Sequence, residues 1–215
     1  MAKDVYVVIE QRDGRVQKVG LELLGEAGKL ARDLGQKVVA LIMGDKAADK
    51  AQLLYQYGAD RVLTVEDPML KEYATEPYAK ALTQIIREYE PEIVLFGATS
   101  IGRDLAPRVA GRVHTGLTAD CTGLDIDPET KNLMMTRPAF GGNIMATIIC
   151  PHYRPQMATV RPGVMKMRER DQGKGGRAEL LKVDFTSEDM NIEILEVYKE
   201  TRKQVDITEA KDLVS

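Results

Sequence analysis

A segment near residue 100 combines residue types that can bind an anion. Thr99 and Ser100 are residues that cap helices, and GRDLAPR at Gly102–Arg108 follows them. The free amides of a helix N-terminus, together with the guanidinium of Arg103, would hold a phosphate or carboxylate. The alternative is a tight, capped turn whose Arg103 lies on the surface or at an interface, and the residues alone favour that alternative.

A second segment, RPAFGGN at Arg137–Asn143, combines an arginine with paired glycines. Gly141 and Gly142 allow a sharp turn or the close approach of another backbone. Arg137 is held extended by the proline that follows it. The segment is either a simple hairpin connection or a loop that contacts a ligand or partner. Arg154 and Arg161 also precede prolines, and an arginine on such rigid backbone is suited to an interface.

The common catalytic and phosphate-binding patterns are absent from the sequence. The loop after the first predicted strand reads EQRDGRV and has no GxGxxG, and no GxxxxGK[ST] occurs. His114 and His152 are isolated, which favours structural roles, and no residues have metal-ligand spacing. Cys121 and Cys150 show no CxxC spacing, so we expect free thiols in a reducing cytoplasm. We therefore predict neither a catalytic nor a metal site.

The elements that would position these residues have an α/β pattern. Short apolar runs predict buried parallel strands, and helical stripes separate them. The four predicted strands are Val5–Ile9, Lys37–Ile42, Arg61–Val65 and Ile93–Phe96. Such repeats predict a doubly wound, mostly parallel sheet with strand order 3-2-1-4-5. The loops Glu10–Arg15 and Gly97–Arg103 would then meet at a crevice between the first and fourth strands.

The rhythm of the sequence changes after Gly111. Short strand-like segments follow without helices between them, and we expect them to add strands to one side of the sheet, antiparallel in part. They are Ala119–Asp125, Leu133–Arg137, Asn143–Cys150 and Gln156–Val160. Lys166–Gly176 is charged and rich in glycine, as a linker would be, and Ile192–Tyr198 alternates like a half-exposed strand.

Composition restricts the possible partners. The 215 residues are 44% hydrophobic and 29% charged, and the net charge is −3. Mixed charges of this kind predict neither nucleic acid nor an anionic membrane as a partner. No apolar run approaches the ~20 residues of a membrane helix. The first residues run directly into a strand, so we expect no signal peptide and a cytoplasmic location.

Six segments together resemble the alpha subunit of electron transfer flavoproteins, in its N-terminal domain. The resemblance covers nearly the whole chain, and the combination of segments in this order is highly specific. The segments are Val8–Glu10, Leu21–Gly28, Phe96–Arg112 (FGATSIGRDLAPRVAGR), Thr115–Asp127 (TGLTADCTGLDID), Thr136–Ile148 (TRPAFGGNIMATI) and Arg154–Met165 (RPQMATVRPGVM).

This resemblance implies a Rossmann-like domain of the adenine-nucleotide-hydrolase type that pairs with a beta subunit. With FAD, such a pair carries electrons from flavin dehydrogenases, such as acyl-CoA dehydrogenases, to an acceptor. It also implies that FAD lies mainly in a C-terminal domain that this sequence lacks. We therefore expect an N-terminal domain over 1–200, and over 201–215 a linker and the start of the FAD domain. An electron carrier needs little acid–base machinery, because the cofactor supplies the redox chemistry.

The resemblance and the residue types together suggest two groups of site residues. Toward the cofactor side we expect Arg137, Gly141, Gly142 and Asn143. At the contact with the beta subunit we expect Arg103, Arg108, Arg154 and Arg161. This domain would then be a scaffold that docks the beta subunit.

Two other readings are compatible with the same fold. A nucleotide-binding stress or regulatory protein would hold AMP or ATP at the crevice. Such proteins carry a glycine-rich phosphate loop after the fourth strand, and Gly97, Gly102 and Gly111 are too sparse to supply one. A pure interaction domain without cofactor is the other alternative.

Overall fold

The computed structural model describes residues 2–139, 144–190, 192 and 194–198. Its centre is a parallel sheet of seven strands in the order β12-β5-β4-β1-β6-β11-β7. These strands are β1 (Val5–Ile9), β4 (Val38–Met43), β5 (Arg61–Val65), β6 (Ile93–Gly97), β7 (Leu117–Cys121), β11 (Gln156–Val160) and β12 (Glu179–Leu180). The predicted order 3-2-1-4 is confirmed as β5-β4-β1-β6. The fifth position belongs to β11, and β7 lies beyond it.

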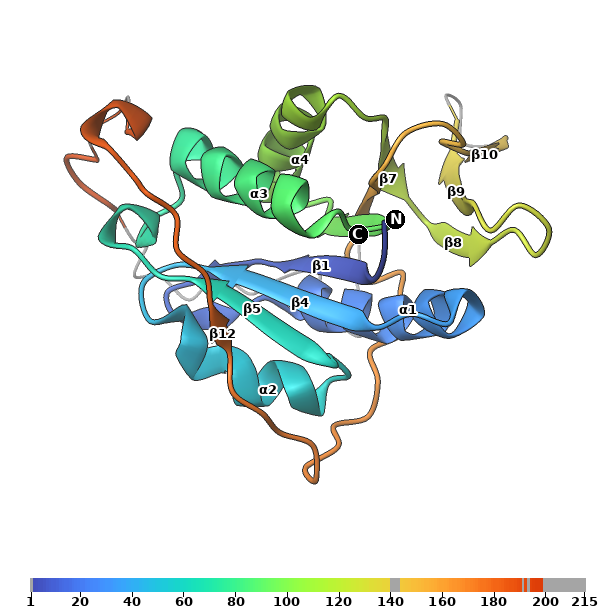
Figure 1. Cartoon of the computed structure of the whole chain (residues 1–215), viewed down its shortest axis with the longest axis horizontal. Coiled ribbons are helices and arrows are strands. Elements are labelled where there is room, and N and C mark those ends of the chain that lie inside the picture. The colour runs from blue at the N-terminus through green and yellow to red at the C-terminus, as the bar shows by residue number, and fades with distance from the viewer. Residues whose placement is uncertain (1, 140–143, 191, 193, 199–215) are drawn as a thin grey trace, which may run out of the picture.

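Helices cover both faces of this sheet, as Figure 1 shows. They are α1 (Lys18–Leu34), α2 (Ala51–Gln56), α3 (Thr75–Tyr89) and α4 (Ser100–Val113). Successive strand residues point to opposite faces, so β1 packs Val5 and Val7 in one core cluster and Tyr6 in the other. The first cluster includes α1 and α2, and the second includes α3 and α4. Both clusters are almost entirely apolar.

Short elements connect or flank these layers. They are the strands β2 (Gln11–Arg12) and β3 (Arg15–Val16) and the 3-10 helices η1 (Ala47–Lys50), η2 (Pro68–Leu70) and η3 (Ser187–Asp189). β2 and β3 form a hairpin within the predicted loop Glu10–Arg15 and its continuation, where Asp13 and Gly14 have φ of 51° and 71°. Two positive φ angles suit the twist of a two-residue hairpin.

A second, antiparallel sheet of three strands lies beside the β7 edge. Its strands are β8 (Gly123–Ile126), β9 (Leu133–Pro138) and β10 (Met145–Ile148), in the order β10-β9-β8. Leu124, Leu133 and Met135 are buried against the α1 side of the central sheet. The antiparallel strands that we expected after Gly111 are therefore in a sheet of their own, while β7 and β11 run parallel to the others.

After β11 the chain runs as a strap, residues 161–190, around the molecule to the opposite edge of the central sheet (Figure 1). It first crosses α1, where a Cβ on Gly25 would lie 2.5 Å from the carbonyl oxygen of Lys166. It then adds β12 beside β5, and Leu181, Val183 and Phe185 pack on the α3 side. The charged segment predicted as a linker is thus packed against helices in its first part. The described residues of the segment predicted as a strand, Ile192–Tyr198, form no strand, so that prediction is wrong.

Candidate functional site

The crevice predicted between the first and fourth strands lies at the carboxyl ends of β1 and β6. The two predicted loops meet there, because Thr99 Oγ1 donates to Glu10 Oε2 at 2.5 Å and Arg12 Nη2 donates to Ser100 Oγ at 3.2 Å. Gly102 makes the turn possible, since a Cβ at this position would lie 1.8 Å from the carbonyl oxygen of Gly97. The sequence therefore located both loops correctly.

The same crevice is poorly suited to a phosphate. Thr99 caps α4, accepting a hydrogen bond from the Gly102 amide at 3.0 Å, and the Glu10 carboxylate contacts the cap hydroxyl. A carboxylate of the chain itself therefore lies beside the α4 N-terminus, where its negative charge would repel a bound anion. The free volume between these loops and Phe96 is about 30 Å³, whereas ligand pockets measure about 300–1,000 Å³. Neither AMP nor ATP fits this crevice as it stands.

Beside the crevice, Asp120 and three arginines form a group that we call the Asp120 cluster. Its members are Asp120 on β7, Arg103 on α4, Arg137 on β9 and Arg161 directly after β11. Arg161 donates from Nε and Nη2 to the two carboxylate oxygens of Asp120, at 3.2 and 2.7 Å. Arg103 Nη2 lies 3.9 Å from the same carboxylate. The fold thus brings together three arginines that lie far apart in the sequence.

Backbone geometry presents the Asp120 carboxylate to these arginines. Asp120 has φ of 60°, and its amide donates to Thr159 Oγ1 at 2.9 Å where the register between β7 and β11 shifts. The hydrogen bonds from Arg161 lower the pKa of Asp120, and the charges of Arg103 and Arg137 lower it further. Asp120 is therefore a carboxylate near neutral pH, held among three cations.

The Asp120 cluster carries more positive than negative charge. The Arg103 and Arg161 side chains are 64% and 46% exposed. The Arg103 side chain is also held in place by the backbone, because its Nε donates to the Ala98 carbonyl at 2.9 Å. Within the described part of the chain the Arg137 side chain makes no hydrogen bond or ion pair. Rigidly held guanidinium groups of this kind can bind carboxylates or phosphates of another molecule.

Arg108, predicted at the subunit contact, lies outside this cluster. It pairs with Glu76 in the first turn of α3, and Arg112 pairs with the same carboxylate. These contacts join α3 to α4. Asp104 lies nearby and accepts hydrogen bonds from Tyr73 and Thr75, which lower its pKa.

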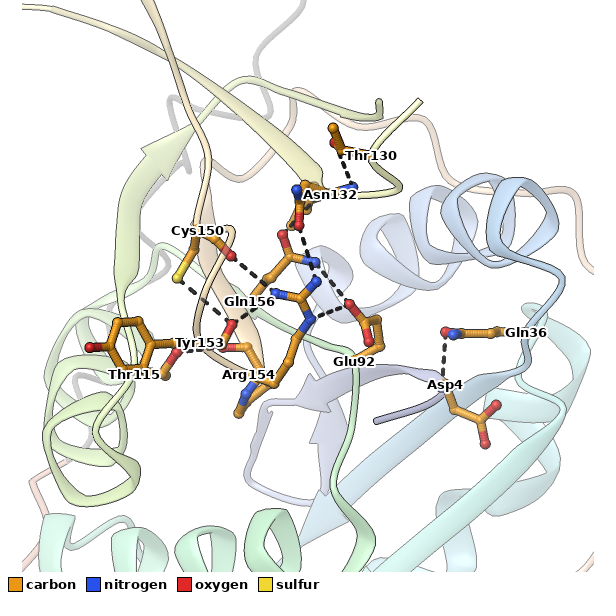
Figure 2. Close-up of polar contacts among 12 residues, drawn as sticks. Asp4, Gln36, Glu92, Thr115, Thr130, Asn132, Cys150, Tyr153, Arg154 and Gln156 are labelled. Carbon is orange, nitrogen blue, oxygen red and sulfur yellow. Dashed lines mark hydrogen bonds and ion pairs between the residues drawn. The ribbon is translucent and has the colours of Figure 1, made fainter. Parts of the chain in front are cut away.

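Arg154, also predicted at the subunit contact, lies at the opposite end of the central sheet and makes internal contacts (Figure 2). We call its contacts the Arg154 network. The guanidinium pairs with Glu92 and donates to Asn132 Oδ1 at 3.0 Å. It also donates to the carbonyl oxygens of Cys150 and Tyr153, at 3.1 and 3.0 Å.

Gln156 extends the network into the core. Its side chain is fully buried, accepts from the Leu133 amide at 2.8 Å and donates to Glu92 Oε1 at 3.1 Å (Figure 2). The network thus ties together the starts of β6, β9 and β11. The contacts of Arg154 fit a role inside the domain, and whether it also touches a partner stays a prediction.

Three of the four residues predicted on the cofactor side, Gly141, Gly142 and Asn143, lie outside the described residues. Arg137 is described, and this member of the Asp120 cluster is half-buried. Sequence reasoning missed Asp120 and Glu10. A lone aspartate inside the strand-like run LTADC was the available signal for Asp120.

Other chemistry finds little support in the described residues. They contain no group of three His, Cys, Asp or Glu side chains placed to hold a metal ion. Nor do they include a helix long and apolar enough to span a bilayer. His114 ends α4 in a left-handed conformation, and His152 is exposed. Burial raises the pKa of the Cys121 thiol to about 11, which makes it a poor nucleophile.

A family model described as "Electron transfer flavoprotein domain" matches residues 5–186. The chain is 50% identical over 213 residues to the electron transfer flavoprotein subunit alpha of Thermoanaerobacterium thermosaccharolyticum, covering 99% of this chain and 64% of that protein. It is 44% identical over 237 residues to the acryloyl-CoA reductase electron transfer subunit beta of Anaerotignum propionicum, covering 99% and 65%. The chain therefore spans about two thirds of the length of these relatives.

A more distant relative is named for a different activity. The lactate dehydrogenase (NAD(+),ferredoxin) subunit LctC of Acetobacterium woodii is 41% identical over 213 residues, covering 99% of this chain and 50% of that protein. All three relatives are named as subunits.

Proposed function

The chain belongs to the electron transfer flavoprotein family, and from that membership we propose that it is the scaffold domain of an alpha subunit. In this role it docks a beta subunit in the cytoplasm and supports an FAD-dependent electron carrier that serves flavin dehydrogenases such as acyl-CoA dehydrogenases. The observation that carries the proposal is 50% identity over 213 residues to a protein named electron transfer flavoprotein subunit alpha.

The crevice between the first and fourth predicted strands does not fit FAD. The crevice at the switch between β1 and β6 has about 30 Å³ of free volume, and the Glu10 carboxylate approaches the α4 N-terminus through Thr99. A flavin's pyrophosphate would meet a negative charge there. We therefore propose that FAD is held mainly by polypeptide outside this domain, with Arg137, Gly141, Gly142 and Asn143 on the side that faces it.

In the proposed assembly this chain holds charged surface side chains in fixed positions. Two apolar cores lock the central sheet between helix layers, so that surface groups such as the Asp120 cluster have fixed places. A rigid platform of this kind lowers the cost of ordering side chains when a second protein binds. The same geometry argues against the AMP- or ATP-binding alternative, because the crevice has neither the volume nor the charge for a nucleotide.

The test is a titration of the purified 215-residue chain. We expect it to bind an electron transfer flavoprotein beta subunit from the same organism in a 1:1 complex by calorimetry. We also expect no bound flavin after gel filtration with excess FAD. ATP or AMP at about 1 mM, the upper end of the usual range of KM values, should leave the melting temperature of the chain unchanged.

Two results would overturn the proposal. One is a chain that alone retains FAD stoichiometrically and passes electrons from a dehydrogenase to an acceptor dye. The other is a rise of several degrees in the melting temperature with ATP, which would favour the nucleotide-binding alternative.

A further inference from the structure

The first part of the strap carries an excess of positive charge, and we call residues 166–177 the cationic strip. Its sequence is KMRERDQGKGGR, with five basic and two acidic residues, whereas the whole chain has a net charge of −3. Within the part of the chain that the structure describes, none of the five basic side chains forms an ion pair. The strip is therefore a basic surface on a chain that is acidic overall. The basic residues are Lys166, Arg168, Arg170, Lys174 and Arg177.

Neutral groups hold the first half of the strip in place, where the strap passes α1 and α2 (orange in Figure 1). The Arg168 guanidinium lies over Gly58, where a Cβ would be 2.9 Å from Nη1. Arg170 Nε donates to Gln56 Oε1 at 2.7 Å, and the Asp171 amide donates to the Gln56 carbonyl at 2.9 Å. These contacts fix the strip without neutralising its charge.

The second half of the strip lies directly on α2, because glycine leaves room for the close approach. A Cβ on Gly176 would be 2.6 Å from the ring of Tyr55. Gln52 Nε2 donates to the Lys174 carbonyl at 3.1 Å, and Tyr55 Oη donates to the Arg177 carbonyl at 3.0 Å. The backbone is thus anchored through its carbonyls, while Lys174 and Arg177 stay exposed. An anchored backbone has less freedom to lose when the surface binds another molecule.

An open groove of about 440 Å³ lies between the strip and α1. Lys29 pairs with Glu26 on its own helix, so three cations and one carboxylate of the lining remain. The groove is therefore basic, and it continues the charge of the strip onto the helix. The charged lining residues are Lys29, Arg32, Lys166, Arg168 and Glu169.

The run QGKGG in the strip would suggest a phosphate loop, but the backbone does not have that form. Phosphate-binding nests need left-handed residues, so that successive amides converge on the anion. None of Gly173, Gly175 and Gly176 is left-handed. The amides of Gly173 and Lys174 already donate to the side chain and the carbonyl of Asp171, at 3.0 and 3.2 Å. The strip can therefore recognise an anion only through its side chains.

Cations spread along an anchored, extended backbone suit a row of carboxylates better than a nucleic acid strand. Single strands are bound by aromatic stacking together with cations, and residues 166–177 include no aromatic residue. The net negative charge of the chain also opposes long-range attraction of a polyanion. Guanidinium groups, by contrast, match carboxylates in two-point contacts.

We propose that the cationic strip and the adjoining groove are a docking site for an acidic segment of another protein. Carboxylates of that segment contact Lys166 and Arg168 at the groove and Lys174 and Arg177 beyond it. Because these cations are exposed, charge governs the contact, and salt weakens it by screening. The inference goes beyond the proposed function, and its test needs neither FAD nor a beta subunit.

The test titrates the whole chain into a fluorescently labelled octaglutamate peptide and follows the anisotropy. We expect saturable binding that weakens about tenfold or more as the salt concentration rises from about 50 to about 500 mM. The triple variant Lys166→Gln, Lys174→Gln, Arg177→Gln should bind the peptide about tenfold more weakly, because each exposed ion contact contributes little and three are removed.

The triple variant Lys3→Gln, Lys37→Gln, Lys71→Gln is the matched control. These three lysines are exposed and lie outside the strip, and within the described residues they form no ion pair. The control changes the net charge by the same amount, so its affinity should stay within about twofold of the parent. Both variants alter exposed side chains and should keep the melting temperature of the parent. Equal losses of affinity in both would show a response to net charge alone and would overturn the inference.

Other results would also count against the proposed occupant. No binding of the peptide at low salt would contradict the inference directly. Tighter binding of inorganic triphosphate or of a single-stranded RNA, lost in the strip variant, would show a site for phosphates instead. If the chain in complex with a beta subunit no longer binds the peptide, the strip is covered in that assembly, and the inference falls while the proposed function stands.

Discussion

Arginines beside prolines occur at both ends of the central sheet, and the two ends use them differently. At the amino ends of β6 and β11, Arg154 meets a carboxylate, an amide oxygen and two carbonyls, so its donors are used inside the chain. At the carboxyl ends, Arg161 shares one carboxylate with Arg103 and Arg137. Both arginines precede a proline, so this pattern does not distinguish them. The number of acceptors around each guanidinium does: Arg154 is used up in contacts within the chain, whereas the arginines around Asp120 can still bind another molecule.

Burial follows the same division. Glu92 is 13% exposed, whereas Asp120 is 29% exposed. An ion pair that is partly removed from water is costly to break because the remaining charge keeps its burial. An exposed pair is screened and contributes little. The Arg154 network should therefore govern folding, and the Asp120 cluster should govern binding.

The largest expected effect is that of Arg154→Ala on stability. It would leave Glu92 without its cation and remove donors from three oxygens, so we expect the free energy of unfolding to fall by about 3 kcal/mol. Urea denaturation followed by circular dichroism measures this.

Arg161→Ala is the control for that experiment, because it removes the same residue type before a proline at the other end. We expect a much smaller change in the urea midpoint. Equal midpoints for the two variants would show that the ends of the sheet do not differ in the way described.

A smaller effect is expected at the carboxyl end for Thr99→Ala. It removes the cap of α4 and the contact with Glu10, which should cost about 1–2 kcal/mol of stability. Thr99→Ser keeps the hydroxyl and should recover most of that loss. If Thr99→Ala is as stable as the parent, the crevice is not held by its own carboxylate and hydroxyl.

The smallest effect is expected for Asp120→Asn, and it depends on pH. The pKa of Asp120 is lowered in the folded chain, so its contribution is complete above the ordinary value of about 3.9 and is lost as pH falls below it. At pH 7 the variant should be less stable by under about 1 kcal/mol. In thermal melts the difference should shrink as the pH falls below the ordinary value, and it should vanish only below the lowered pKa of the folded chain. A difference that grows with acidity would contradict the assigned contacts.

The central strands and helices could be predicted because a local pattern of residue types marks each of them. Runs such as KVVALI mark strands buried on both faces, and the stripe on α3 marks its packed side. The insertion of β11 between β6 and β7 could not be predicted. The three-stranded sheet separates β7 from β11 in sequence, and no local signal says that a strand returns to fill an inner position.

The candidate site shows the same limit. Glycine and arginine types correctly marked the loops that meet at the crevice, since Gly102 is required by a backbone contact. The types could not tell Arg154 from Arg161, because the difference lies in Glu92 and Asn132, which come from distant segments. Asp120 was missed for the same reason, as its role depends on three arginines brought in by other elements.

The strap that leaves β11 and returns to β5 has a consequence for how the chain is made. β5 ends at Val65, but the strand that covers its outer edge begins at Glu179. While the ribosome is synthesising everything between them, that edge of the growing sheet is open to any neighbouring nascent chain. A chaperone that shields this edge early, or a slow pause that prolongs its exposure, would therefore change the yield of folded protein without altering the finished fold.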